Sequence, residues 1–400
     1  MSDARALPAG FWWGCLVNLL CLSGHQIGVL VPGYLASRGL ERWEIGLADG
    51  AFWMAALLVQ PWIGPRLDRE GPRRYLVAGA LAMGALVALF LVAPPRLAAV
   101  LPLRAAQGAA MAVYLTAAWT WAASLGSAEQ LVRVFGFYGI SGLLPNAIGP
   151  AAGEVAQVRL GYPAMFLLAA ALELGAGLLA VGMVDVGAGA RGREPAVPFG
   201  AALRAPVLYG AIATALCFGV LTGSLTTFLG PFMLVVPLAG VAAYWAVYTV
   251  LSVAVRIGGM SLAERLGPER LIVVPVLTMA AGVALVALVR ADGGMAMPLL
   301  VLAASTTGAG HGMLFPAFNA LAVRRLGPEA RGTALALVSA AVYLGGAVGN
   351  PLIGLVAQVA GYRAMYAVVA AGGLLMAMLF PVLERPNAAA ELLILNPKDR

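Results

Sequence analysis

Long apolar runs with few charges alternate with short polar segments along the whole chain. The runs are continuous and lack the strict apolar–polar alternation of a barrel strand, so they predict helices. Each run reaches the roughly 20 residues that an α-helix needs to cross the hydrocarbon core of a membrane. We predict twelve such spans, at 11–36, 44–64, 75–94, 98–124, 132–157, 162–184, 207–232, 239–262, 271–290, 296–322, 333–358 and 362–383.

Composition supports a lipid environment for these runs. Hydrophobic residues make up 62% of the 400 residues and charged residues 11%, whereas soluble domains are nearer half apolar and a quarter charged. Backbone polar groups have no water to bond in lipid, which leaves helices or closed barrels as spanning structures. We therefore predict an all-α integral membrane protein. The first span lacks a basic leader region, and we expect it to be retained rather than cleaved.

The net charge of +7 follows membrane topology and does not indicate a nucleic-acid partner. With the N-terminus in the cytoplasm, 17 of the 25 Lys and Arg residues fall in cytoplasmic segments. This bias is the positive-inside rule, and it predicts that both termini are cytoplasmic.

Three segments of the first half return about 200 residues later. GPRLDREGPRR at 64–74 resembles MSLAERLGPER at 260–270, GYPAMF at 161–166 resembles GYRAMY at 361–366, and GPAAGEVAQ at 149–157 resembles NPLIGLVAQ at 350–358. One half is therefore a diverged copy of the other. We predict a six-helix bundle over 1–184, a cytoplasmic linker over 185–206, a second bundle over 207–384 and a cytoplasmic tail over 385–400.

The first charged turn carries a specific resemblance. Its pattern Gly64-x-x-x-Asp68-Arg69-x-Gly71-x-Arg73-Arg74 resembles the signature of the major facilitator superfamily between spans 2 and 3. Arg104-x-x-Gln107-Gly108 on span 4 resembles the family's second motif. Gly149-Pro150-x-x-Gly153 on span 5 resembles a motif typical of its proton-coupled exporters, and it departs from the fuller pattern at Glu154, where a second glycine is usual. The chain as a whole resembles the proton-coupled bacterial drug, sugar and metallophore exporters of this family.

The resemblance implies two parallel six-helix repeats with a solute path at their interface. It also implies that the charged turn latches the two halves together on the cytoplasmic side. The alternative is a plain topological anchor, which explains the arginines but neither Asp68 nor the glycines. The expected gate residues are Gly64, Asp68, Arg69, Gly71 and Arg73, with Glu264 and Arg265 in the second copy.

Ionisable residues within the spans are costly and call for a role. A proton can compete with an arginine for a carboxylate, which would couple proton binding to movement. Arg104 needs an acceptor, and the sequence leaves both Asp49 and Glu154 open. A static ion pair is the alternative. Glu173 lies on span 6 and is either hydrogen-bonded in its neutral form or directed at a lateral opening. The proton-coupling candidates are Asp49, Arg104, Glu154 and Glu173.

The resemblance places spans 1, 4, 7 and 10 around the cavity, and each of the two histidines lies midway along one of them. Either histidine could bind solute or carry a proton, or could simply bond a neighbouring helix. No metal site is expected, because no HxxxH motif or Cys/His cluster is present. The cavity candidates are His25, Gln26, Tyr114, Trp119, Asn146, His311, Tyr343 and Asn350.

These features predict a secondary transporter that exports a small organic molecule in exchange for protons by alternating access. An importer of an organic anion or nutrient and a lipid or lysolipid transporter remain alternatives. We expect no enzymatic activity and no cofactor, because neither a nucleotide-binding loop nor a Ser/His/Asp set is visible. The expected partners are solute, protons and the lipid bilayer. We expect a functional monomer in the inner membrane of a bacterium.

Overall fold

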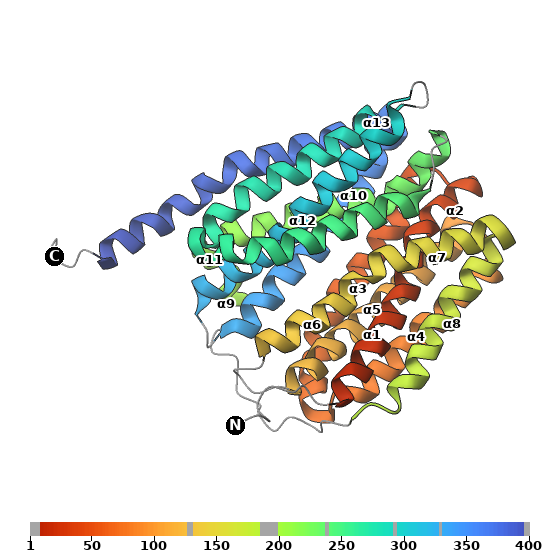
Figure 1. Ribbon diagram of the computed structural model, residues 1–400, viewed down its shortest axis with the longest axis horizontal. Helices are drawn as coiled ribbons and strands as arrows, with labels where there is room; N and C mark the ends of the chain where they lie inside the picture. Colours follow the sequence, from red (N-terminus) through yellow and green to blue (C-terminus); the bar gives the residue numbers. More distant parts are fainter. Residues whose placement is uncertain are drawn as a thin grey trace. The chain divides into compact units, whose positions relative to one another are not determined.

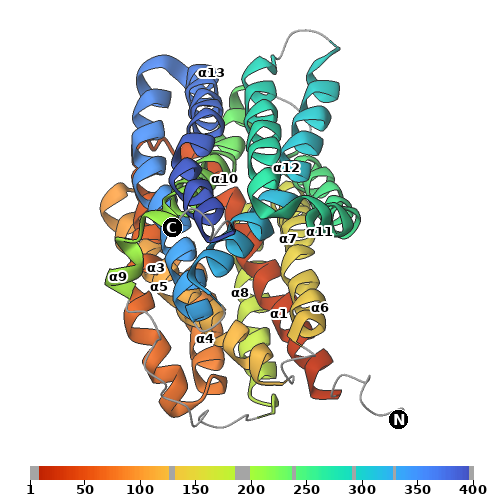
Figure 2. The same ribbon diagram turned by 90° about the vertical axis from the view of Figure 1, so that its left-hand side faces the viewer.

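The computed structural model describes residues 9–125, 131–184, 199–236, 240–290, 294–327 and 330–395. Helices provide the regular secondary structure of these ranges. The all-α class predicted from the apolar runs is therefore confirmed. Figures 1 and 2 show the helices from two directions at right angles.

The first half of the chain forms the helices drawn from red to yellow-green in Figure 1. Three of the six predicted spans are broken by a 3-10 turn or a second helix. The helices are α1 (Ala9–Ile27), η2 (Gly28–Leu30), α2 (Val31–Ser37), α3 (Arg42–Glu70), α4 (Arg73–Ala88), η3 (Leu89–Leu91), α5 (Leu97–Ser124), α6 (Leu131–Leu143), α7 (Pro145–Leu160) and α8 (Tyr162–Ala180).

The second half has fewer and longer helices. They are α9 (Phe199–Leu203), η4 (Pro206–Leu208), α10 (Tyr209–Val235), α11 (Val241–Leu288), α12 (Ala296–Leu326) and α13 (Arg331–Leu395). The 48 residues of α11 would extend about 72 Å as one straight helix, more than twice the roughly 30 Å of a hydrocarbon core. Its sequence accordingly holds two apolar windows, Val241–Gly258 and Leu271–Leu288, each able to cross a membrane.

Within the described ranges, eight segments are long and apolar enough to span a membrane. One of them, Gly332–Glu384, has 53 residues and contains two of the predicted spans. Helices α3, α6, α7 and α12 are not among the eight. The multi-pass character is thus established, while the count of twelve stays a prediction.

The chain divides into two compact units. The first combines Met1–Gly192 with Thr226–Thr249, and the second combines Arg193–Leu225 with Val250–Arg400. The first unit therefore includes the end of α10 and the start of α11, although these follow the predicted linker in sequence. The boundaries predicted at 185–206 and 385–400 stay predictions.

Two glycines in repeated sequence segments end helices in the same way. Gly161 has φ 86° and ψ 174° between α7 and α8, and Gly361 has φ 85° and ψ 164° inside α13. A positive φ of this kind is open to glycine and strained for other residues. The predicted break between spans 11 and 12 is thus present within α13, at Gly361.

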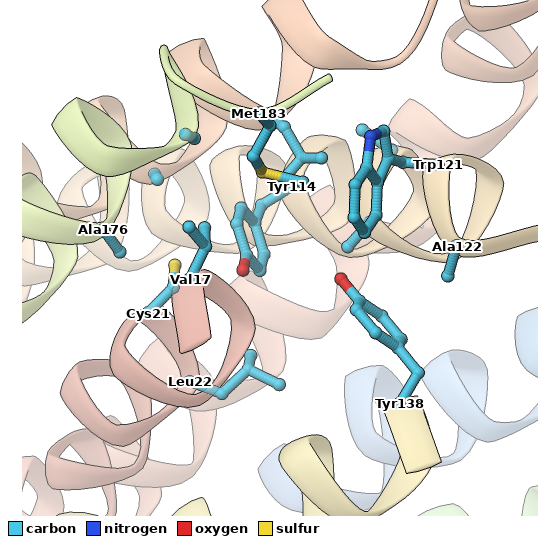
Figure 3. Packing of buried hydrophobic residues seen from close by; sticks show 14 of the residues in the cluster. Val17, Cys21, Leu22, Tyr114, Trp121, Ala122, Tyr138, Ala176 and Met183 are labelled. Carbon is cyan, nitrogen blue, oxygen red and sulfur yellow. The ribbon is translucent and has the colours of Figure 1, made fainter. Parts of the chain in front are cut away.

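Aromatic and small side chains fill the core of the first unit. Figure 3 shows Tyr114 and Trp121 of α5 and Tyr138 of α6 converging there beside Cys21 and Val17 of α1. The three aromatic residues are at most 1% exposed. Tight packing at this level fixes α1, α5 and α6 against one another.

Three side chains donate hydrogen bonds to backbone carbonyl groups in the last turn of α8 and in the residues that follow it. Trp13 donates to the carbonyl of Leu179 at 3.0 Å, Trp121 donates to that of Val184 at 3.0 Å, and Arg73 donates to that of Val181. Carbonyls at a helix C-terminus have no partner within the helix, and positive charge is favourable there. This end of α8 is therefore tied to α1, α4 and α5.

Glycines allow helices of each unit to approach at backbone distance. A Cβ on Gly108 of α5 would lie 1.9 Å from the carbonyl oxygen of Phe52 on α3. In the second unit, a Cβ on Gly312 of α12 would lie 2.5 Å from the carbonyl oxygen of Ser252 on α11. Small residues commonly permit such close packing between membrane helices.

Candidate functional site

A buried ion pair joins α3 and α5 in the first unit. Arg104 donates to Asp49 and, from its other terminal nitrogen, to the Oε1 of Gln107 at 3.1 Å. Asp49 and Arg104 are 7% and 8% exposed. Of the two acceptors that the sequence left open for Arg104, the structure places Asp49 beside it.

Asp49 has two further partners on its second carboxylate oxygen. Thr227 of α10 donates to Oδ2 at 2.6 Å, and the indole of Trp53 donates to the same atom at 3.3 Å. A buried carboxylate needs several donors to offset the loss of water. No sequence pattern singles out Thr227, since a threonine on an apolar helix is common.

An aromatic ring lies between the arginine and a histidine. The guanidinium carbon of Arg104 lies 4.6 Å from the ring centre of Phe52, and the ring of His25 stacks on Phe52 at 5.7 Å and 21°. A cation over a phenyl face gains an electrostatic attraction that strengthens when water is excluded. His25 of α1 therefore belongs to the surroundings of the Asp49–Arg104 pair.

A small cavity opens beside this group. Its free volume of about 20 Å³ has space for one or two water molecules. Its walls come from α1, α2, α3, α4, α5, α8 and the turn η2. The lining residues are Gly24, His25, Gly28, Val31, Phe52, Met83, Val87, Arg104, Gln107 and Glu173.

Glu173 reaches this cavity from α8 and is only 3% exposed. Its Oε2 has no hydrogen-bond partner among the residues that the structure describes. A Cβ on Gly24 would lie 2.7 Å from the Cγ of Glu173, so the missing side chain of Gly24 makes room for the carboxyl group. The cavity thus brings three predicted residues, His25, Arg104 and Glu173, to one place.

Glu154 of α7 is not among the residues that line this cavity, and its side chain lies beside the start of α11. Its Oε2 accepts a hydrogen bond of 2.8 Å from the backbone N–H of Ala242. A Cβ on Gly240 would fall 2.0 Å from the other carboxylate oxygen. A carboxylate at this place caps a helix N-terminus and complements its dipole.

The other predicted cavity residues of the first unit lie in three different surroundings. Gln26 of α1 donates to Asn146 of α7, so the structure brings these two together. Tyr114 is fully buried and donates to Asn18 at 3.3 Å, which makes it part of the core. Trp119 is 38% exposed and packs edge-on against Tyr138.

The candidates of the second unit lie on α12 and α13. His311 contacts Phe218 edge-on at 4.9 Å and stacks with Phe315 at 6.2 Å. Asn350 is fully buried, and its Oδ1 lies 2.3 Å from where a Cβ of Gly223 would be. Tyr343 is half-buried. His25 and His311 belong to different units.

The charged turn between α3 and α4 is partly described. Gly71 ends α3 with φ 78°, Arg69 is exposed, and Gly64 lies on α3 with open space around it. Arg73 bonds the end of α8, as given above. The side chains of Asp68, Glu264 and Arg265 lie outside the described residues, so their gate role stays a prediction.

A second buried ion pair escaped the sequence analysis. Arg325 near the end of α12 donates to Glu384 of α13 at 2.7 Å. Both residues lie close to segments that the sequence assigns to the cytoplasm, where charges are common, so neither drew attention. Their side chains are 8% and 11% exposed, which sets them apart from ordinary surface charges.

Sequence comparison then identifies the family. The sequence profile of the Major Facilitator Superfamily matches residues 11–325 and 259–394, which together cover most of the chain. The chain belongs to the Major Facilitator Superfamily. An uncharacterized MFS-type transporter of Salmonella typhimurium, STM4428, is 26% identical over 368 residues, covering 90% of this chain and 92% of that protein. The uncharacterized MFS-type transporter YhhS of Escherichia coli K12 is 28% identical over 362 residues, covering 88% and 85%.

Solved structures show the same fold. The nucleoside transporter NupG has a TM-score of 0.78 at 15% identity, covering 94% of this chain and 99% of that one. A bacterial homologue of the human lysosomal transporter Spinster has a TM-score of 0.76 at 15% identity, covering 96% and 98%. The predicted major facilitator fold is confirmed. Family membership supports secondary transport of a small molecule by a multi-pass membrane protein.

Within the described ranges, no group of three or more His, Cys, Asp or Glu residues is placed to hold a metal ion. Arg104 and Glu173 line one small, water-sized cavity, and Asp49 forms an ion pair with Arg104. Such a set can exchange a proton for an ion pair without any further ligand.

Proposed function

We propose that this chain exports a small organic molecule in exchange for protons, by alternating access. The observation that carries the proposal is the double engagement of Asp49, which bonds Arg104 on α5 and Thr227 on α10. Protonation of Asp49 would remove its charge and weaken both contacts at once. Proton binding would thereby be linked to the contact between α3 and α10.

The span 5 motif and the Arg104 motif support export rather than import. In the alternative, an importer of an organic anion, Arg104 would hold the solute. The contact of Arg104 with Asp49 argues against that role, because its charge is already balanced in this arrangement.

We assign the charged turn at 64–74 to a latch that closes the path on the cytoplasmic side. Asp68→Asn is expected to slow transport at an unchanged affinity for solute, because the latch acts on the rate of interconversion and touches no solute. Initial transport rates at several solute concentrations test this. Glu70→Gln is the matched control, since Glu70 pairs locally with Arg74 one turn away. An unchanged maximal rate in Asp68→Asn would contradict the latch.

The test of export uses purified protein in vesicles with an acidic lumen and a pH-sensitive dye inside. Drugs, sugars, organic acids and metallophores are added outside in turn. Exchange predicts that a transported solute makes the lumen more alkaline. Asp49→Asn is expected to lose this response, while protein-free vesicles supply the baseline. Proton movement in the same direction as the solute would identify an importer and overturn export.

A further inference from the structure

Glu173 has a buried carboxyl group that forms no ion pair with the residues that the structure describes. It is 3% exposed, and its Oε2 lacks a hydrogen-bond partner in the described part of the chain. An ionised carboxylate is costly in such a place unless a charge or several donors compensate it. In this arrangement the group is therefore stable with a proton attached.

The groups around Glu173 show what could compensate its charge. Arg104 on α5 lines the same cavity and is the positive charge available there. On α1, His25 lines the cavity and Cys21 lies nearby; on α5, Tyr114 lies nearby as well. The wall from α4 consists of Met83 and Val87, which do not titrate.

Two further acidic groups lie on helices that pack against α5 or α8. Asp49 on α3 already holds Arg104. Glu154 on α7, which packs on α8, is occupied by the N–H of Ala242. Arg104 thus has one carboxylate partner at present and a second carboxyl group across a cavity of about 20 Å³.

We propose that Glu173 is a proton-binding site that shares Arg104 with Asp49. When Asp49 is ionised, it holds Arg104 and Glu173 keeps its proton. When Asp49 takes up a proton, Arg104 is released and can stabilise the carboxylate of Glu173. The O–H bond of Glu173 then breaks, the proton passes to water in the cavity, and the negative charge stays on the carboxylate facing Arg104.

The site deepens the proposed proton coupling by giving the chain two acidic groups whose protonation is linked through one arginine. Proton binding at Glu173 does not depend on the direction of transport or on the solute. It can therefore be tested on the resting protein, and a failure of the export proposal would leave the result unaffected.

Infrared difference spectroscopy of the purified full-length protein is the test, because a protonated carboxyl group has its own C=O stretching band. We expect such a band at neutral pH in the parent protein and its loss in Glu173→Gln, which keeps size and neutrality. Glu173→Asp should shift the band rather than remove it. This variant therefore shows whether the loss of the band in Glu173→Gln comes from the missing carboxyl group or from a folding defect. Glu154→Gln should keep the band, as the matched control.

The proposed sharing of Arg104 by Asp49 and Glu173 leads to a second prediction for the same spectrum. Asp49→Asn mimics the protonated state of Asp49 and frees Arg104 for Glu173. The Glu173 band should then disappear at a lower pH than in the parent protein. A band that survives in Glu173→Gln would overturn the proton site. A band that titrates at the same pH with and without Asp49→Asn would overturn the sharing of Arg104.

Discussion

Arg104 uses both terminal nitrogens and one face of its planar guanidinium group. One terminal nitrogen bonds Asp49, the other bonds Gln107, and the flat face lies over Phe52. A lysine has a compact ammonium group and cannot make the same set of contacts at once. The residue type at position 104 is therefore determined by three neighbours rather than by charge alone.

The Asp49–Arg104 pair should be strongly coupled in stability. Removing one partner of a buried ion pair leaves the other charge uncompensated, at a cost of about 3–5 kcal/mol. We expect Asp49→Asn and Arg104→Gln each to lower the melting temperature in detergent. The loss in melting temperature of the double variant should be smaller than the sum of the losses of the two single variants.

Thermal unfolding of the four proteins, monitored by tryptophan fluorescence, measures this coupling. Arg96→Gln is the control, since Arg96 is exposed just before α5. Strictly additive losses would show that the pair contributes no interaction of its own.

The sequence could identify the charged members of this site, together with His25 and Gln107, but not Phe52 or Thr227. Asp49, Arg104 and Glu173 were conspicuous because charges within apolar runs are rare. Phe52 and Thr227 have common side chains for a membrane helix and gave no such signal. The choice between Asp49 and Glu154 as partner of Arg104 depends on distances between helices, which periodicity along one helix does not contain.

At the scale of helices, the contact between α3 and α5 depends on one missing side chain. A Cβ on Gly108 would lie 1.9 Å from the backbone oxygen of Phe52, which cannot rotate away. Gly108→Ala should therefore push the helices apart and disturb the Asp49–Arg104 pair just beyond. Overpacking of this kind costs about 1–3 kcal/mol.

A matched glycine on another helix tests this reasoning. A Cβ on Gly175 of α8 would meet nothing within 4 Å. Gly175→Ala should be neutral or stabilising by up to about 1 kcal/mol, because alanine favours the helix. The melting temperatures of Gly108→Ala and Gly175→Ala, each compared with that of the parent protein, measure the two effects. Equal effects would mean that the α3–α5 contact adapts to a methyl group.

Helix existence was predictable from the apolar runs, whereas helix ends were not. One helix was expected over 132–157, but α6 ends at Leu143 and α7 begins at Pro145, whose ring suits a first helical position. Helices α7 and α13 continue through Pro150 and Pro351. Neighbouring helices decide whether a proline bends its helix, and a single sequence does not report them.

At the scale of the molecule, two carboxylates bond residues from beyond the predicted linker. Asp49 accepts from Thr227, and Glu154 accepts from the N–H of Ala242. Both partners belong to Thr226–Thr249, the segment that groups with the first unit. Repeats in sequence predicted two halves, but they could not predict which helix ends each half would hold.

Glu154 should control the stability of the start of α11. Glu154→Leu removes the acceptor for Ala242, and losing a capping side chain costs about 1 kcal/mol, or roughly fivefold faster amide exchange. Glu154→Gln keeps an acceptor oxygen and should show a smaller change. Hydrogen–deuterium exchange of peptides covering 240–249 measures the effect.

The exposed neighbour Val155 offers the control, since Val155→Leu changes the same turn of α7 on its exposed side. Equal exchange in Glu154→Leu and Val155→Leu would contradict the capping role.

Val184 and Glu384 each accept a hydrogen bond from a side chain on another helix. They lie 200 positions apart, at corresponding ends of the two copies. In the first copy, Trp121 donates to the backbone of Val184; in the second, Arg325 donates to the side chain of Glu384. The two copies therefore fasten corresponding chain positions with different chemistry, a neutral hydrogen bond in one and a pair of opposite charges in the other. Repetition of the sequence indicates where such contacts lie, but not which groups make them.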